Sequence, residues 1–351
     1  MNILPGLLLA LVLAFAGQFL SEFIGIDLMG LPKSPISAIM MAIILGIIIR
    51  NTITLPAALQ PGIRFGLVRI LRLGIVLLGI RLSLGEAGSI GLQALPVIIG
   101  AVTAALLIVT FLARRLGLSG KLGTLIAVGT SICGATAIVA TAPTIAAKDD
   151  EVAYSVACVT LFGVVAMLVY PFVGNWFFDG DAFKAGLFLG TSVHETAQVA
   201  GAGLVYQQYY NDPQALDVAT VTKLVRNLGM LLIIPLMSVL YHRNHSDGTE
   251  APKWYTMIPL FVIGFACMSL LRTVGDMGDQ PFGILEPEQW KSIVGYTKQA
   301  AELCLAVAMA AVGLGTSIKG LRDIGLRPLG AGLLAAVLVG AVSITLITLL
   351  Y

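Results

Sequence analysis

Residues 129–134 read Gly-Thr-Ser-Ile-Cys-Gly, and residues 315–320 repeat the pattern as Gly-Thr-Ser-Ile-Lys-Gly. Both motifs lie in apolar stretches. Glycine tolerates non-helical dihedrals there, and Thr and Ser hydroxyls can satisfy backbone groups that a broken helix sets free. We therefore predict an interrupted membrane-spanning helix at each motif. A third Gly-Thr-Ser at 190–192 does not share the spacing of the other two.

The composition around these motifs is that of a membrane protein. Of 351 residues, 58% are hydrophobic and only 11% are charged, against about 25% charged in soluble domains. So few charges cannot cover a soluble protein of this size, which excludes a soluble enzyme and a disordered chain. The formal net charge of +2 gives no basic field for nucleic acid. The four cysteines include no CxxC pair, so neither a disulfide framework nor a zinc site is expected.

A helix that crosses a bilayer needs about 20 mostly apolar residues. On this criterion the sequence predicts an all-α polytopic protein with about eleven transmembrane helices. The predicted spans are 3–21, 34–50, 66–84, 91–113, 122–146, 152–174, 183–206, 216–240, 254–272, 298–318 and 328–350. Lys and Arg concentrate in the loops on the N-terminal side, so the positive-inside rule predicts a cytoplasmic N-terminus and a periplasmic C-terminus.

A second match supports an internal repeat. Residues 72–78 resemble residues 226–232, allowing one inserted residue, and both matches lie five spans apart. Because an odd offset reverses direction through the bilayer, we predict inverted five-helix repeats at 34–176 and 183–351, with residues 1–33 as an extra helix. Such repeats are typical of secondary transporters, whose sites lie where discontinuous helices cross. The alternative is chance recurrence of small residues in packed helices.

Ionisable residues inside a span are functional candidates. His194 and Glu195 follow the third Gly-Thr-Ser, and on a helix His194 and Gln198 would share one face. We expect these three residues to carry or gate a coupling proton; the alternative is a structural hydrogen-bond pair between helices. The pattern also approaches the zinc-protease motif HExxH, but the second His is absent. No metal and no cofactor are expected.

Lys223 and Arg226 begin the eighth span, and the repeat makes Arg226 the counterpart of Arg72. Cations at both mouths of a pathway suit an anionic substrate; the alternative is snorkelling to lipid headgroups. Backbone N–H groups and hydroxyls at the interruptions would add contacts. The expected substrate-binding residues are Thr130, Ser131, Cys133, Gly134, Thr191, Ser192, Lys223, Arg226, Thr316 and Ser317.

Two other charged pairs have ordinary interpretations. Arg81 and Glu86 flank the end of the third span and are expected to pair at the membrane interface. Glu302 lies four residues after Lys298, a helical spacing that favours an ion pair.

Several blocks resemble a known family. They are 72–83, 129–138, 161–163 with 166–167 and 170–171, Ser192-Val193-His194-Glu195-Thr196-Ala197-Gln198-Val199, 223–226, and 308–314 with 328–329. In this order they are similar to the YeiH family of bacterial inner-membrane transporters, which are labelled sulfate exporters. The resemblance implies kinship with the cation–proton antiporter and anion transporter group, whose members have two inverted five-helix repeats, crossed broken helices and often an elevator motion.

These observations predict a secondary transporter, not an enzyme. We expect an elevator-type exporter of a small anion such as sulfate, sulfite or a sulfonate, coupled to protons. The alternatives are a cation–proton antiporter of the same fold, with a proton or sodium as coupling ion, and a channel. The expected partners are the small anion and the lipid bilayer of the bacterial inner membrane. A homodimer is plausible by analogy with elevator carriers, and no nucleic acid is expected.

Overall fold

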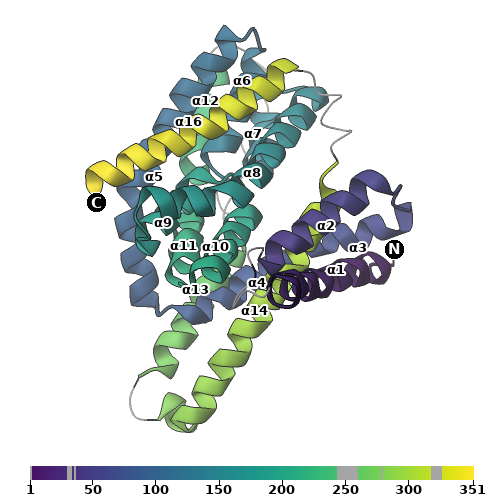
Figure 1. The fold of residues 1–351 in the computed structure, drawn as a ribbon. Helices are drawn as coiled ribbons and strands as arrows, with labels where there is room; N and C mark the ends of the chain where they lie inside the picture. Colours follow the sequence, from purple (N-terminus) through teal and green to yellow (C-terminus); the bar gives the residue numbers. More distant parts are fainter. Residues whose placement is uncertain (1, 30–33, 35–36, 243–259, 278–279, 318–325) are drawn as a thin grey trace. The chain divides into compact units, whose positions relative to one another are not determined.

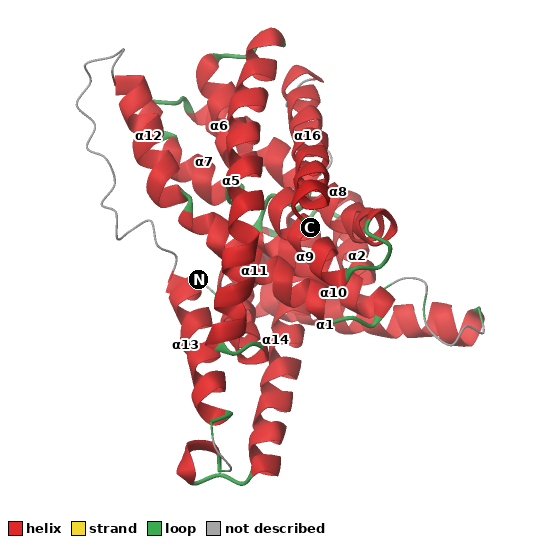
Figure 2. Cartoon of the chain, turned by 90° about the vertical axis from the view of Figure 1, so that its left-hand side faces the viewer, coloured by secondary structure: helices red, strands yellow, loops and turns green. Residues whose placement is uncertain are grey.

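A computed structural model describes residues 2–29, 34, 37–242, 260–277, 280–317 and 326–351. These residues form helices joined by loops, and no strand occurs among them (Figure 2). The α-helices are α1 Leu4–Glu22, α2 Ala38–Thr52, α3 Gln60–Phe65, α4 Leu71–Leu78, α5 Leu84–Arg115, α6 Gly120–Ser131, α7 Ala135–Thr141, α8 Asp149–Phe177, α9 Ala182–Ser192, α10 Thr196–Tyr210, α11 Gln214–Leu228, α12 Met230–His242, α13 Leu260–Gly275, α14 Pro287–Gly315 and α16 Leu326–Leu350. The all-helical prediction is confirmed for this part of the chain.

Among the residues that the structure describes, six helical segments are long and apolar enough to cross a membrane. They are Leu4–Leu28, Leu84–Arg115, Asp149–Phe177, Gln214–Met237, Pro287–Gly315 and Pro328–Leu350. Large apolar side chains are exposed along two of them, at Leu92 and Leu107 of α5 and at Val337 of α16. A row of exposed apolar side chains suits a lipid environment. The chain is therefore a helical membrane protein, and the count of eleven spans stays a prediction.

Interruptions fall within two of the predicted spans that carry the Gly-Thr-Ser pattern. In the first, α6 ends at Ser131 and α7 begins at Ala135, with Gly134 at φ 64°, a dihedral that glycine adopts readily. In the second, α9 ends at Ser192 and α10 begins at Thr196. The expectation of one continuous helix over 183–206 was therefore wrong. His194 lies in the interruption, so it does not share a helical face with Gln198.

The last Gly-Thr-Ser motif closes a long helix. α14 ends at Gly315, and Thr316 is extended. Residues 318–320, the second half of this predicted interruption, lie outside the described residues.

The chain forms two compact units, each built from several separate segments. Unit 1 comprises Met1–Ser89, Gly203–Pro213 and Leu260–Lys319, and unit 2 comprises Ile90–Ala202, Gln214–Pro259 and Gly320–Tyr351. Each unit draws on both of the predicted repeats, whose boundaries stay a prediction. The colours of Figure 1 follow the chain through both units.

In unit 1, α2 packs between α1 and α14 (Figure 1). The contact with α14 uses glycine: a Cβ atom on Gly46 would lie 2.8 Å from the carbonyl oxygen of Ala310, and a Cβ on Gly313 would overlap the backbone of α2. Small residues allow two membrane helices to approach this closely, and van der Waals packing then holds them together.

A small polar cluster joins the end of α13 to the start of α14. Asp276 accepts a hydrogen bond from the indole Nε1 of Trp290 at 2.8 Å and pairs with Arg272. Partial burial opposes ionisation of Asp276, but these two hydrogen bonds outweigh it and hold the pKa of the carboxyl below its ordinary value.

In unit 2, α11 packs closely on α9, which also contacts α8 and α16. A Cβ atom on Gly190 would lie 2.6 Å from Cβ of Thr222, so glycine is required for this approach of α9 to α11. α6 packs on α8, and Ile126 of α6 shares an apolar cluster with Val109 of α5 and Ala335 of α16. This packing brings the two interruptions and α11 together.

Candidate functional site

Two helices of unit 2 end at the same place, and Lys223 of α11 lies between their ends. Its Nζ donates to the carbonyl oxygens of Ile132 at 2.8 Å and Val193 at 3.0 Å, and also to that of His194. The first carbonyl follows α6 and the other two follow α9. All three ammonium protons are therefore used on backbone oxygens of the two interruptions.

Arg226, one turn further along α11, contacts the last carbonyls of the same two helices. Its Nε donates to Ser131 at 2.7 Å, Nη1 to Thr191 at 2.5 Å, and Nη2 to Thr130. Longer contacts at 3.3 Å join Nη1 to Gly190 and Val193. The planar guanidinium suits this task because it presents donors in several fixed directions.

The chemistry of the interruptions explains why two cations are buried here. A helix C-terminus leaves its last carbonyls unpaired and carries about half a negative charge. Such groups are expensive away from water unless they are hydrogen-bonded. Lys223 is 0% exposed and Arg226 is 1% exposed. The expectation from the sequence that these two cations lie at the mouth of a pathway was therefore wrong. They neutralise two converging helix ends.

The hydroxyls that the sequence analysis proposed as anion donors bond within their own helices. Thr130 donates to Ile126 at 2.6 Å and Thr191 to Leu187 at 2.7 Å. Ser131 and Ser192 likewise donate to carbonyls of α6 and α9. In this arrangement their oxygens have only acceptor capacity left.

Glu195 reaches into the α6–α7 interruption. Its Oε1 accepts a hydrogen bond from Thr160 Oγ1 of α8 at 3.0 Å. The side chain lies so close to Gly134 that a Cβ atom there would overlap its Cγ. A carboxylate is therefore held beside the helix ends that Lys223 and Arg226 neutralise.

Gln198 fixes the start of α10. Its Oε1 accepts from the backbone N–H of Glu195 at 3.1 Å, and its Nε2 donates to the Thr160 carbonyl at 3.0 Å. The amide packs against Gly163 so tightly that a Cβ on Gly163 would overlap it. Thr160 and Gly163 were not among the site residues predicted from the sequence. They lie three residues apart and therefore on one face of an apolar helix, and this spacing of a threonine and a glycine was the signal that could have identified them.

His194 is 1% exposed, and its Nδ1 has no hydrogen-bond partner within the described structure. Its carbonyl, by contrast, accepts from Lys223. Asn227 of α11 joins the same region through Nδ2, which donates to Thr196 Oγ1 at 3.1 Å.

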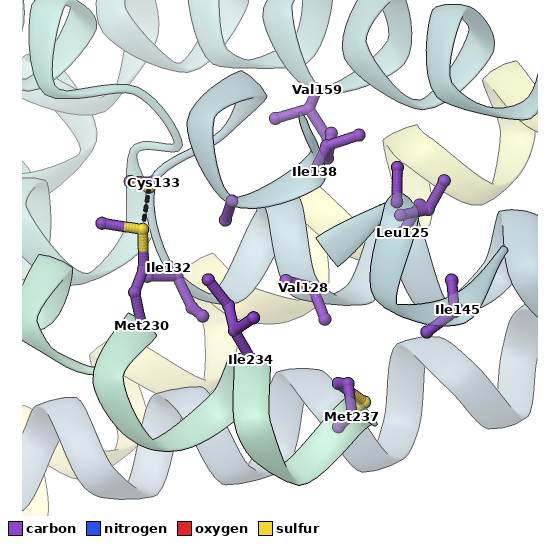
Figure 3. Close-up of a cluster of buried hydrophobic side chains, with 12 residues drawn as sticks. Leu125, Val128, Ile132, Cys133, Ile138, Ile145, Val159, Met230, Ile234 and Met237 are labelled. Carbon is purple, nitrogen blue, oxygen red and sulfur yellow. Dashed lines mark hydrogen bonds between the residues drawn. The ribbon is translucent and has the colours of Figure 1, made fainter. Parts of the chain in front are cut away.

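Cys133 lies on the apolar side of the interruption. Its sulfur is 3.4 Å from the sulfur of Met230 at the start of α12, in a cluster with Ile132 and Ile234 (Figure 3). The surroundings of Cys133 in this cluster are hydrophobic rather than those of a ligand site. Within the parts of the chain that the structure describes, no three His, Cys, Asp or Glu side chains converge as metal ligands.

Two of the predicted substrate-binding residues, Thr316 and Ser317, belong to unit 1, as does Arg72, the predicted repeat counterpart of Arg226. Thr316 and Ser317 follow α14 there; Thr316 donates to Val312, and its carbonyl accepts from Asn51 at 3.0 Å. Arg72, the repeat counterpart of Arg226, is exposed, with its guanidinium carbon 5.9 Å from the ring centre of Phe261. The remaining predicted residues all lie together in unit 2.

Charged side chains in unit 1 make further contacts. Arg81 pairs with Glu302 at 3.2 Å, and Gln207 contacts both side chains. Glu86 caps the start of α5, where its carboxylate accepts hydrogen bonds from the N–H and the hydroxyl of Ser83.

Comparison with known proteins now identifies the family. The family model for conserved hypothetical protein 698 matches residues 5–332. The chain belongs to this family. The family is also named UPF0324 and is the YeiH-like group that the sequence blocks resemble, so the resemblance is confirmed.

Curated relatives match over nearly their whole length. A UPF0324 membrane protein of Fusobacterium nucleatum is 32% identical over 324 residues, covering 91% of this chain and 90% of the relative. One from Streptococcus agalactiae is 33% identical over 318 residues, covering 91% and 89%. One from Nitratidesulfovibrio vulgaris is 32% identical over 328 residues, covering 91% and 85%. No solved structure matches the chain.

Proposed function

We propose that this membrane protein is a secondary transporter for a small anion, with the crossing of the two interrupted helices as its central site. The observation that carries the proposal is the pair of interruptions at 132–134 and 193–195, bridged by buried Lys223 and Arg226 and accompanied by the Glu195 carboxylate. Interrupted helices with ionisable groups between them are the usual site of secondary transporters.

The two cations act through their field rather than by direct contact with the anion, because their protons are used on carbonyl oxygens. A field in a low-dielectric interior is strong enough to favour an anion close by. Glu195 and His194 would carry the coupling proton. Sulfate, sulfite and sulfonates are the substrates to test first, and export through the bacterial inner membrane is the proposed direction.

An elevator mechanism is part of the proposal. All the residues around the crossing lie in unit 2, and an elevator carrier needs its site on one body that moves as a whole. A homodimer would give the other body a fixed anchor. The cytoplasmic N-terminus and periplasmic C-terminus complete the proposed topology.

The test is transport by purified protein in liposomes. Labelled sulfate, sulfite and methanesulfonate are offered under an imposed pH gradient, with protein-free liposomes as the control. We expect saturable uptake of at least one anion that depends on the gradient and is weakened in Glu195→Gln. Glu302→Gln is the matched control, because Glu302 is a partly exposed carboxylate in unit 1. No flux of any anion by folded protein would refute the proposal.

A cation–proton antiporter is the second candidate, and a specific observation favours it. Glu195 is a carboxylate in contact with the Thr160 hydroxyl, which has only acceptor capacity left once it donates to Glu195, and such oxygens suit a cation. Sodium-driven proton movement, read with a pH-sensitive dye inside the liposomes, would favour this candidate. Conductance in a planar bilayer far above carrier rates would instead indicate a channel.

A further inference from the structure

The carboxylate of Glu195 occupies a position built for an anion. It receives the Thr160 hydroxyl at 3.0 Å, and the absence of a side chain at Gly134 leaves the space in which it lies. Lys223 exerts an electrostatic attraction on it. A hydroxyl donor and a nearby cation form an environment that also suits a dissolved monoanion.

The charges at the crossing can be counted from the structure. Lys223 donates three hydrogen bonds, which only its ammonium form can supply, so Lys223 and Arg226 contribute +2. The converging ends of α6 and α9 contribute about −0.5 each. The remainder is about +1, which the Glu195 carboxylate cancels when it is ionised. A buried site with a net charge is unfavourable, so the centre holds one negative charge besides the helix ends.

The neighbours of Glu195 include two further groups that could titrate. The interruption between α6 and α7 contributes Cys133, which is buried among apolar side chains, and the segment of Glu195 itself contributes His194, which is 1% exposed. Burial favours the neutral form of both groups, so they leave the sum unchanged. α11 contributes Lys223 and Arg226, already counted, and α8 contributes Thr160, which does not titrate.

Resting on the proposed function, we propose that the substrate is a monovalent anion that replaces the Glu195 carboxylate in this position, while Glu195 takes up one proton. The carboxylate leaves the Thr160 hydroxyl and takes up one proton from the buffered solution, and the anion receives the hydrogen bond from Thr160. The net charge of the centre is then the same before and after binding. A divalent anion such as sulfate would leave a buried excess of −1 and is disfavoured.

Binding to the full-length protein in detergent tests this inference. Methanesulfonate and sulfate serve as the monovalent and divalent probes, and the dissociation constant is measured by calorimetry at pH 6 and pH 8. If one proton binds with each anion, the affinity for methanesulfonate rises by about tenfold for each unit by which the pH falls, over the pH range in which Glu195 of the free protein is ionised. Sulfate is expected to bind at least about tenfold more weakly than methanesulfonate at pH 6, a difference of about 1.4 kcal/mol.

Variants assign the proton to Glu195. In Glu195→Gln the affinity for methanesulfonate is expected to be equal at the two pH values, whereas Glu302→Gln should keep the wild-type dependence. Calorimetry of the wild type in two buffers of different ionisation enthalpy gives the proton count directly and needs no variant. About one proton taken up per anion is the expected value.

The outcomes separate the two proposals. Flux of no anion in liposomes refutes the proposed function, whereas binding of neither probe by a protein that transports another anion overturns only the inference. Anion binding without proton uptake, a pH dependence that survives in Glu195→Gln, or sulfate binding as tight as methanesulfonate overturns the inference and leaves the transporter proposal standing.

Discussion

Replacing Arg226 with leucine should destabilise the protein strongly. Three carbonyl oxygens, those of Thr130, Ser131 and Thr191, lose their short hydrogen bonds. Each buried acceptor left without a partner costs about 1–3 kcal/mol, so the three together cost about 3–9 kcal/mol. Removing one partner from a buried charged cluster costs about 3–5 kcal/mol. The two ranges for the whole substitution overlap at about 3–5 kcal/mol, which we take as the expected loss of unfolding free energy.

Thermal unfolding in detergent measures this loss. At about 2–4 °C per kcal/mol for units of roughly 150–250 residues, the melting temperature should fall by roughly 6–20 °C. Arg72→Leu is the matched control, because Arg72 is the sequence counterpart of Arg226 but is exposed over Phe261. An exposed cation–π contact is worth about 0.5–1 kcal/mol, so its melting temperature should fall by less than about 4 °C.

A third variant separates charge from geometry. Arg226→Lys keeps the positive charge but cannot direct donors to three separate carbonyls, so an intermediate loss is expected. If Arg226→Leu melts within the range of Arg72→Leu, the carbonyl contacts contribute little, and our account of the helix ends is refuted. If Arg226→Lys is as stable as the wild type, charge alone is sufficient and the directional argument fails.

Three further predictions concern other parts of the chain. Gly134→Ala forces a residue with a Cβ atom into φ 64°, which costs about 1–3 kcal/mol, and the new Cβ would overlap Cγ of Glu195; an unchanged melting temperature would contradict this. Trp290→Phe removes a hydrogen bond that lowers the pKa of Asp276. A carboxyl whose pKa is lowered by folding stabilises the folded protein at pH values above the pKa of that carboxyl in the unfolded chain. The stability gap between wild type and Trp290→Phe should therefore be widest at pH 6 and shrink below about pH 4, and a gap that widens in acid would exclude this cause. For Arg81 and Glu302, a double-mutant cycle with glutamine at each position should give a coupling of about 0.5–1 kcal/mol, because Glu302 is 39% exposed; zero coupling would mean that the pair contributes nothing.

The sequence predicted the long helices because their signal is local. The apolar runs of α1, α5, α8 and α16 contain enough consecutive residues to identify a span without knowledge of their neighbours. The interruption before α7 was also predictable, since Gly134 adopts a dihedral that disfavours other residues.

The second interruption was missed for a physical reason. Residues 193–195 contain neither glycine nor proline, so nothing local forbids a continuous helix. The carbonyls of Val193 and His194 instead bond to Lys223, about thirty residues away in the chain. The pairing of Arg81 with Glu302 has the same origin, because the partners are separated by 221 positions. Tertiary contacts of this kind leave no periodic signal in one sequence.

The donors of Lys223 and Arg226 contact backbone oxygens and no side-chain acceptor among the bonds described above. Every amino acid supplies a carbonyl oxygen, so these contacts do not depend on which side chain stands at positions 131, 132 or 193. A saturation mutagenesis map of unit 2 should therefore be uneven. The two basic positions should tolerate almost no replacement, whereas the residues whose oxygens they bind should accept substitutes of similar volume. Such a map would separate the residues that act through their side chains, Lys223 and Arg226, from those that act only through their backbone oxygens.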